Sequence, residues 1–174
     1  MSENIHDKGY KYLFSNKQFF RELIETFVTE DWVKDIDFDD CQKIDKSFVS
    51  DHYKETESDI IYKVKFKNED AYIYLLLEFQ STVVWYMALR VLNYVSNFYM
   101  DYVESDPKIR KLPPIFPLVL YNGDEKWTAK TDFRDLLDKP DLLKQYSPQL
   151  HYFKIAENEY DKDTFVEKAI IATR

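Results

Sequence analysis

Glycine is almost absent from this sequence, since only Gly9 and Gly123 occur among its 174 residues. Loops that hold nucleotide phosphates need several glycines, because the backbone must approach the phosphate closely. Neither the GxGxxG pattern nor the GxxxxGK[ST] pattern occurs in the chain. The sequence therefore excludes the dinucleotide-binding and P-loop classes.

Cysteine is also scarce, because Cys41 is the single one in the sequence. One cysteine excludes an internal disulfide framework and a cysteine zinc site, and it suits a reducing cytoplasm, where we expect the protein. The opening MSENIHDKGY lacks the basic, apolar and cleavage-site order of a secretory signal.

Positive charge is in deficit, with 24 Lys and Arg against 32 Asp and Glu and a net charge of −8. An acidic chain gains little from general attraction to phosphates. DNA binding would therefore need a local basic patch, a metal ion that offsets the repulsion, or a segment outside this sequence.

Apolar residues are plentiful, at 45% hydrophobic and 17% aromatic. This composition is typical of a globular protein, and the length suits one domain, residues 1–174, with a real core. Because the last helical pattern has no closing cap, we expect this domain to be the N-terminal part of a longer protein.

Hydrophobic periodicity predicts an α/β fold, a mixed sheet flanked by helices. The expected elements, in chain order, are helix 6–28 with a break at Ser15-Asn16, a short strand 46–50, two strands within 57–81 joined by a turn at 67–70, helix 82–105, strand 115–121, a short helix 132–139, strand 149–155 and helix 161–174. The acidic run 31–40 is expected to be a solvated loop. Charged and amide residues interrupt helix 82–105, so we expect no membrane span.

The stretch YIYLLLEFQS, residues 72–81, places Glu78 near the end of an otherwise apolar strand. A buried charge is costly unless it has a partner. Antiparallel pairing about the turn at 67–70 brings Asp59 to the same end of the sheet as Glu78. Because side chains alternate between the faces of a strand, Glu78 shares a face of its strand with Gln80, and Asp59 shares a face of its strand with Lys63. Two carboxylates at that end, with the carbonyl of Phe79, could hold Mg²⁺, and Gln80 would aim at the same point to orient a water molecule.

Four ordered blocks carry a family resemblance: ESDIIYKV, YIYLLLEFQST, WYMALRVLNYV and LPPIFPLVLYNGD, with HDKGYKYLF before them. Together they resemble the Rpn (recombination-promoting nuclease) or YhgA-like transposase family of bacteria, which is similar to a branch of the PD-(D/E)XK nuclease superfamily. The resemblance extends from about His6 to Trp127.

The resemblance implies a restriction-endonuclease-like core in the order αβββαβ with C-terminal additions. It implies a DNA endonuclease linked to recombination or mobile elements, dependent on Mg²⁺ or Mn²⁺. Asp59 and Glu78 take the places of the superfamily's acids, and Gln80 stands where many members carry lysine. Asp7 takes the place of an extra acid on the first helix, and Val84 stands where family members often have an acid.

Several residues keep two interpretations. Asp7 suits a helix N-cap as well as a metal ligand. Arg90 suits a DNA phosphate or a structural pairing with a nearby acid. Lys11 and Lys63 are further candidates for DNA contact. Lys11, Lys63 or Lys65 could supply the positive charge that Gln80 does not.

A second function of a different class is a catalytically weak or inactive nuclease fold that serves as a DNA-associated or protein-interaction module. This second function is favoured by Gln80 in place of a lysine, by the net negative charge and by Val84 in place of an acid. The convergent pair Asp59 and Glu78 favours the nuclease. A transposase in the strict sense would need a further DNA-recognition region. A homodimer is implied by resemblance, because superfamily nucleases often pair to cut two strands.

Overall fold

The computed structural model describes residues 3–44, 59–78 and 82–160, with the backbone alone for residues 3–8. Five strands form one mixed sheet in the order β1-β2-β3-β4-β5. The strands are β1 Ile36–Ile44, β2 Asp59–Phe66, β3 Glu69–Glu78, β4 Ile115–Tyr121 and β5 Phe153–Ala156. β1, β2 and β3 are antiparallel, whereas β4 and β5 run parallel to β3.

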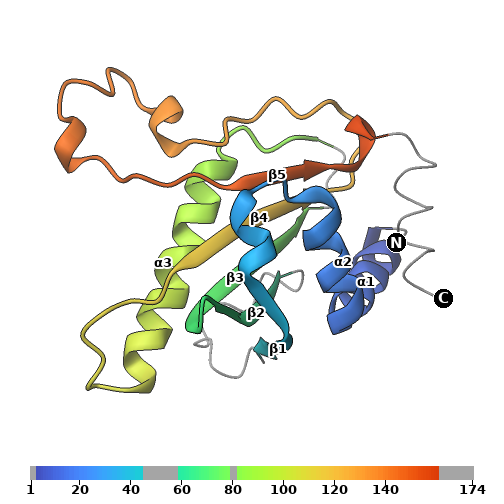
Figure 1. Cartoon of the computed structure of the whole chain (residues 1–174). Helices are drawn as coiled ribbons and strands as arrows, with labels where there is room; N and C mark the ends of the chain where they lie inside the picture. The colour runs from blue at the N-terminus through green and yellow to red at the C-terminus, as the bar shows by residue number, and fades with distance from the viewer. Residues whose placement is uncertain (1–2, 45–58, 79–81, 161–174) are drawn as a thin grey trace.

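Helices cover both faces of this sheet (Figure 1). On one face lie α1 Glu3–Phe14 and α2 Lys17–Phe27, and on the other lies α3 Met87–Ser105. The strand pleat separates two cores accordingly, because alternate residues of β3 enter different clusters: Ile73 and Leu75 pack toward α2, and Tyr74 and Leu76 pack toward α3. The expected mixed sheet flanked by helices is confirmed at this level.

The predicted break in the first helix is confirmed. Asn16 has extended backbone angles, and its side-chain oxygen accepts a hydrogen bond of 2.8 Å from the backbone N–H of Gln18. This is the geometry of an N-cap, which satisfies a donor that a helix start leaves unpaired. The following helix α2 is strongly amphipathic, and Phe20, Leu23 and Ile24 on its inner face are buried.

The acidic run 31–40 was wrongly predicted to be a solvated loop. Residues Asp31–Asp35 form a 3-10 turn, η1, and β1 begins at Ile36. Ile36, Phe38 and Cys41 are buried in the core under α2, while the aspartates between them point outward. The alternation of apolar and acidic residues was a strand signal that the high charge obscured.

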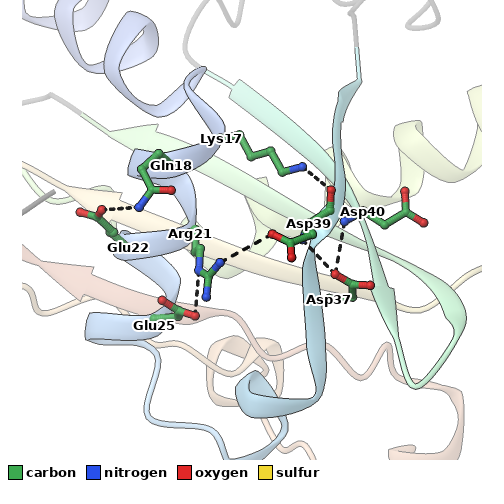
Figure 2. A network of polar contacts seen from close by, with 8 residues as sticks. All are labelled: Lys17, Gln18, Arg21, Glu22, Glu25, Asp37, Asp39 and Asp40. Carbon is green, nitrogen blue, oxygen red and sulfur yellow. Dashed lines mark hydrogen bonds and ion pairs between the residues drawn. The ribbon is translucent and has the colours of Figure 1, made fainter. Parts of the chain in front are cut away.

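An irregularity in β1 explains why this strand tolerates three aspartates. The pairing register with β2 shifts between Asp37 and Gln42, as at a β-bulge. Asp37 accepts hydrogen bonds from the backbone N–H groups of Asp39 and Asp40. From α2, Lys17 donates to the Asp39 carbonyl and Arg21 approaches its carboxylate at 3.9 Å (Figure 2). The exposed network ties the outer strand to α2 and contributes modestly to stability.

The two strands of 57–81 and their turn are confirmed. β2 and β3 pair in register from Asp59 opposite Leu76 to Phe66 opposite Glu69. Lys67 and Asn68 form the two-residue turn, and both have positive φ, at 50° and 68°. Such a turn matches the right-handed twist of a hairpin. The predicted strand 46–50 and helix 161–174 lie outside the described residues.

The connection from β4 to β5 is irregular rather than helical. The predicted short helix 132–139 is a single 3-10 turn, η4 Phe133–Leu136, and a second turn, η5, covers Lys144–Tyr146. Asn122-Gly123 leaves β4, but Gly123 does not have a positive φ. A Cβ on Gly123 would lie 2.1 Å from the hydroxyl of Tyr121, so glycine is needed here for close approach to a buried ring.

Helix α3 forms within the predicted segment 82–105 but begins only at Met87, because residues 82–86 form a bend and a turn. It carries the chain from β3 back to β4. Within the described part of the chain, no helix combines the length and apolar character needed to cross a bilayer.

Candidate active site

The carboxyl ends of the parallel strands define one edge of the sheet. β3 ends at Glu78 and β4 ends at Tyr121, which pair directly, and β5 ends at Ala156 opposite Tyr121. Because β2 is antiparallel to β3, its first residue, Asp59, lies at this same edge. Open α/β sheets commonly bind ligands outside the carboxyl ends of their strands.

Asp59 and Glu78 lie on the same face of neighbouring strands. Asp59 is opposite Leu76, and Glu78 follows Leu76 by two residues, so their side chains point to the face that α3 covers. Such diagonal neighbours are separated by about 7–8 Å between backbone positions, within reach of a shared ligand. Both residues are only 3% exposed. Two acids buried so close together require compensating positive charge or hydrogen bonds.

Arg90 from the first turn of α3 supplies positive charge to Glu78. Its Nη1 lies 2.7 Å from Glu78 Oε2. Nε and Nη2 donate to the hydroxyl of Tyr94 at 3.3 and 3.1 Å, and the guanidinium lies 5.7 Å from the centre of that ring. Burial opposes the charge on Arg90, but the hydrogen bonding with Tyr94 and the attraction of Glu78 outweigh it, so the pKa of Arg90 is raised.

Asp59 is linked to the same group through aromatic rings. Its Oδ2 accepts a hydrogen bond of 2.7 Å from the hydroxyl of Tyr74. The rings of Tyr74 and Tyr94 are parallel, with an interplanar angle of 1° and centroids 6.3 Å apart. We call these five residues, Asp59, Tyr74, Glu78, Arg90 and Tyr94, the carboxylate cluster.

The chemistry of the cluster suits a hard divalent cation. Carboxylate oxygens are the ligands that Mg²⁺ takes, and Mg²⁺ keeps several waters, so two protein carboxylates are enough to hold it. No group of three or more His, Cys, Asp or Glu side chains able to hold a metal occurs among residues 3–44, 59–78 and 82–160. Among the side chains that the structure describes, an ion here would therefore depend on Asp59 and Glu78.

The other predicted site residues are distributed differently. Gln80 and the Phe79 carbonyl lie outside the described residues, as does the side chain of Asp7, whose backbone is in α1. Lys11 is also on α1, which packs through Phe14 into the core on the opposite face of the sheet from the carboxylate cluster.

Lys63 shares the face of Asp59 but lies four residues along β2, roughly 13 Å away at 3.3 Å per residue. Its Nζ is 2.8 Å from Asp70, which Lys65 contacts as well. The hydrogen bond that Lys63 donates to Asp70 is the main cause that raises the pKa of Lys63, and the hydrogen bonds from the two lysines lower the pKa of Asp70. The structure therefore gives this lysine an acidic partner of its own, away from the cluster.

Sequence reasoning missed Tyr74 and Tyr94 and did not name the acid beside Arg90. One available signal was the spacing of Arg90 and Tyr94, which are four residues apart and so lie on one side of a helix. Another was Tyr74, which shares the strand face of Glu78.

A third carboxyl group, Glu157, lies just after β5 at the same edge of the sheet. Its Oε2 accepts a hydrogen bond of 3.0 Å from the hydroxyl of Tyr10 on α1. Burial raises the pKa of Glu157 from 4.5 to about 7, and the hydrogen bond from Tyr10 opposes that rise. Burial is also the main cause that raises the pKa of Tyr10.

The raised pKa of Glu157 predicts that the stability of the folded chain depends on pH. Between pH 4.5 and about 7 the folded chain binds more protons at Glu157 than the unfolded chain does. The free energy of unfolding should therefore fall as the pH rises through this window, by roughly 2 kcal/mol. Urea unfolding at pH 5 and pH 7.5 measures it. In Glu157→Gln this part of the slope should vanish, whereas in Glu104→Gln, an exposed acid on α3, it should persist.

The fold and the cluster define an α/β protein with two buried carboxylates at the carboxyl edge of a mixed sheet. The family described as "Putative transposase, YhgA-like" matches residues 4–172, and the chain belongs to this family.

Several curated proteins of Escherichia coli are similar to it. Recombination-promoting nuclease RpnD of strain O157:H7 is 30% identical over 68% of this chain and 45% of its own length. Recombination-promoting nuclease RpnA of strain K12 is 31% identical over 57% of this chain and 34% of its own. The strain K12 protein named "Inactive recombination-promoting nuclease-like protein RpnE" is 24% identical over 80% of this chain and 46% of its own length. The chain spans less than half the length of each of these three relatives. No solved structure matches it.

Proposed function

We propose that this chain is a metal-dependent DNA endonuclease linked to recombination, with a PD-(D/E)XK core and its active site at the carboxylate cluster. The observation that carries the proposal is the placement of Asp59 and Glu78 on one face at one edge of the sheet. The element order α1-α2-β1-β2-β3-α3-β4 supports it, because it contains the αβββαβ order of that core. Relatives named recombination-promoting nucleases support it too.

In this proposal Asp59 and Glu78 hold Mg²⁺ or Mn²⁺, with the Phe79 carbonyl and, from α1, Asp7 as further oxygens. When bound, such an ion would polarise the phosphate and lower the pKa of an attacking water. Gln80 orients that water through hydrogen bonds, because a neutral amide supplies no positive charge as a lysine would. Arg90, Lys63 and Lys11 contribute contacts to DNA phosphates. The protein acts in the cytoplasm, and a homodimer would cut both strands.

A second candidate is a nuclease fold without activity that serves as a DNA-associated or protein-interaction module. The ion pair between Arg90 and Glu78 favours it, since a cation of the protein itself already compensates the charge of Glu78. The net charge of −8 and relatives named inactive agree with it.

Incubation of the purified chain with supercoiled plasmid, with Mg²⁺, with Mn²⁺ and with a chelator, separates the two functions. The endonuclease should nick or linearise the plasmid only when a divalent ion is present. Gel electrophoresis follows the conversion. No conversion under any of the three conditions would reject the endonuclease and leave the inactive module. Equal conversion with the ion and with the chelator would reject dependence on a metal.

A further inference from the structure

Arg90 contacts Glu78, one of the two carboxylates that the proposed function assigns to a metal ion. Its Nη1 contacts Glu78 Oε2 at 2.7 Å, a distance typical of a charge-assisted hydrogen bond. Glu78 is buried and Arg90 is partly buried, so water screens their interaction only weakly. A divalent ion bound to the same carboxylate would repel the guanidinium strongly. The two cations are therefore competitors for Glu78.

Tyr94 provides a second hydrogen-bond partner for the guanidinium of Arg90. Its hydroxyl accepts hydrogen bonds from both Nε and Nη2, and it lies one helical turn after Arg90 on α3. The ring of Tyr94 is stacked on Tyr74, whose hydroxyl contacts Asp59. The guanidinium thus contacts Glu78 directly and is linked to Asp59 through the rings of Tyr94 and Tyr74.

We propose that Arg90 is a positioning residue that serves as an exchangeable counter-ion of Glu78: it neutralises the buried acid while no metal is bound, and a divalent ion must displace it to bind. This inference rests on the proposed function, because it assumes that the carboxylate cluster takes a divalent ion. It explains how two acids remain buried before metal binding, and it makes the affinity for the ion depend on Arg90 and Tyr94.

Mn²⁺ binding to the chain, measured by calorimetry and by the loss of the free-ion EPR signal, tests the exchange. Arg90→Gln removes the competing charge, and the dissociation constant for Mn²⁺ should fall at least about tenfold. Arg90→Lys keeps the charge and should stay within about threefold of the unmodified chain. Tyr94→Phe keeps the stacked ring but releases the guanidinium, and it should bind about threefold more tightly.

The melting temperature gives a second readout that a merely structural arginine would not produce. Without metal, Arg90→Gln should melt below the unmodified chain, because Glu78 loses its counter-ion. Saturating Mn²⁺ should remove that difference. A lower melting temperature that Mn²⁺ does not restore, together with unchanged or weaker binding, would overturn the exchange. If Arg90→Gln does not fold, Tyr94→Phe decides, and an unchanged affinity in that variant overturns the exchange as well.

Glu78→Gln separates failure of this inference from failure of the proposed function. Loss of Mn²⁺ binding in Glu78→Gln, with no tightening in the Arg90 and Tyr94 variants, rejects the exchange and leaves the metal site in place. Absence of Mn²⁺ binding in the unmodified chain, or equal binding in Glu78→Gln, rejects the metal site itself and the exchange with it.

Discussion

Asp59→Asn and Glu78→Gln are each expected to lower the rate of Mg²⁺-dependent plasmid cleavage by at least about 100-fold. Each change replaces a carboxylate by an amide of nearly the same size, so the packing of the carboxylate cluster is kept while the negative charge is lost. Loss of one preorganised electrostatic group at a reacting centre costs about 10²–10³ in rate, and under the proposed function, in which each acid is a direct metal ligand, the loss should be no smaller. Initial rates with a fixed plasmid concentration measure the effect.

Glu69→Gln is the matched control, since Glu69 is an exposed acid at the other end of the same strand. Its cleavage rate should equal that of the unmodified chain. If Asp59→Asn and Glu78→Gln cleave as fast as Glu69→Gln, cleavage does not depend on these two carboxylates, and the nuclease site must lie elsewhere.

Phe20→Ala is expected to lower the free energy of unfolding by about 3–5 kcal/mol, which is the usual cost of emptying a large buried aromatic position. Phe20 is fully buried on α2. Its ring stacks on Tyr62 of β2 at 3.8 Å between centroids and meets Phe38 of β1 edge to face. The substitution therefore removes the ring contacts of Phe20 that help to hold α2 against β1 and β2. Urea unfolding followed by circular dichroism measures the change.

Tyr12→Ala provides the comparison, because this aromatic ring on α1 is 85% exposed. It should change the free energy of unfolding by less than about 0.5 kcal/mol. A loss in Phe20→Ala no larger than the loss in Tyr12→Ala would mean that α2 does not pack on the sheet as described. Since neither residue belongs to the carboxylate cluster, the result bears on the fold alone.

Local patterns predicted those elements whose apolar residues follow one clear period. The hairpin of β2 and β3, helix α3 and the break before α2 agree with the sequence analysis because period, turn residues and cap all lie within a few residues of one another. β1 was missed because its inner residues, Ile36 and Phe38, alternate with aspartates that we expected to be solvated. Pairing with β2 outweighed the low strand propensity of Asp.

The candidate site was predictable to the extent that one hairpin forms it. Asp59 and Glu78 belong to adjacent antiparallel strands, so alternation and the position of the turn were enough to bring them to one edge. Their surroundings were not predictable in this way. Whether Arg90 meets Glu78 depends on how α3 rotates and tilts against the sheet, which side-chain packing in the second core decides.

The class of fold, the hairpin and the placement of Asp59 and Glu78 at one edge of the sheet could all be predicted from the residues, because they follow from short-range period and strand pairing. The arginine that meets Glu78, and the link through Tyr74 and Tyr94 to Asp59, became evident only once the helices were packed on the sheet. Contacts between a helix and a sheet depend on the packing of many side chains at once, whereas contacts within a hairpin follow from backbone geometry.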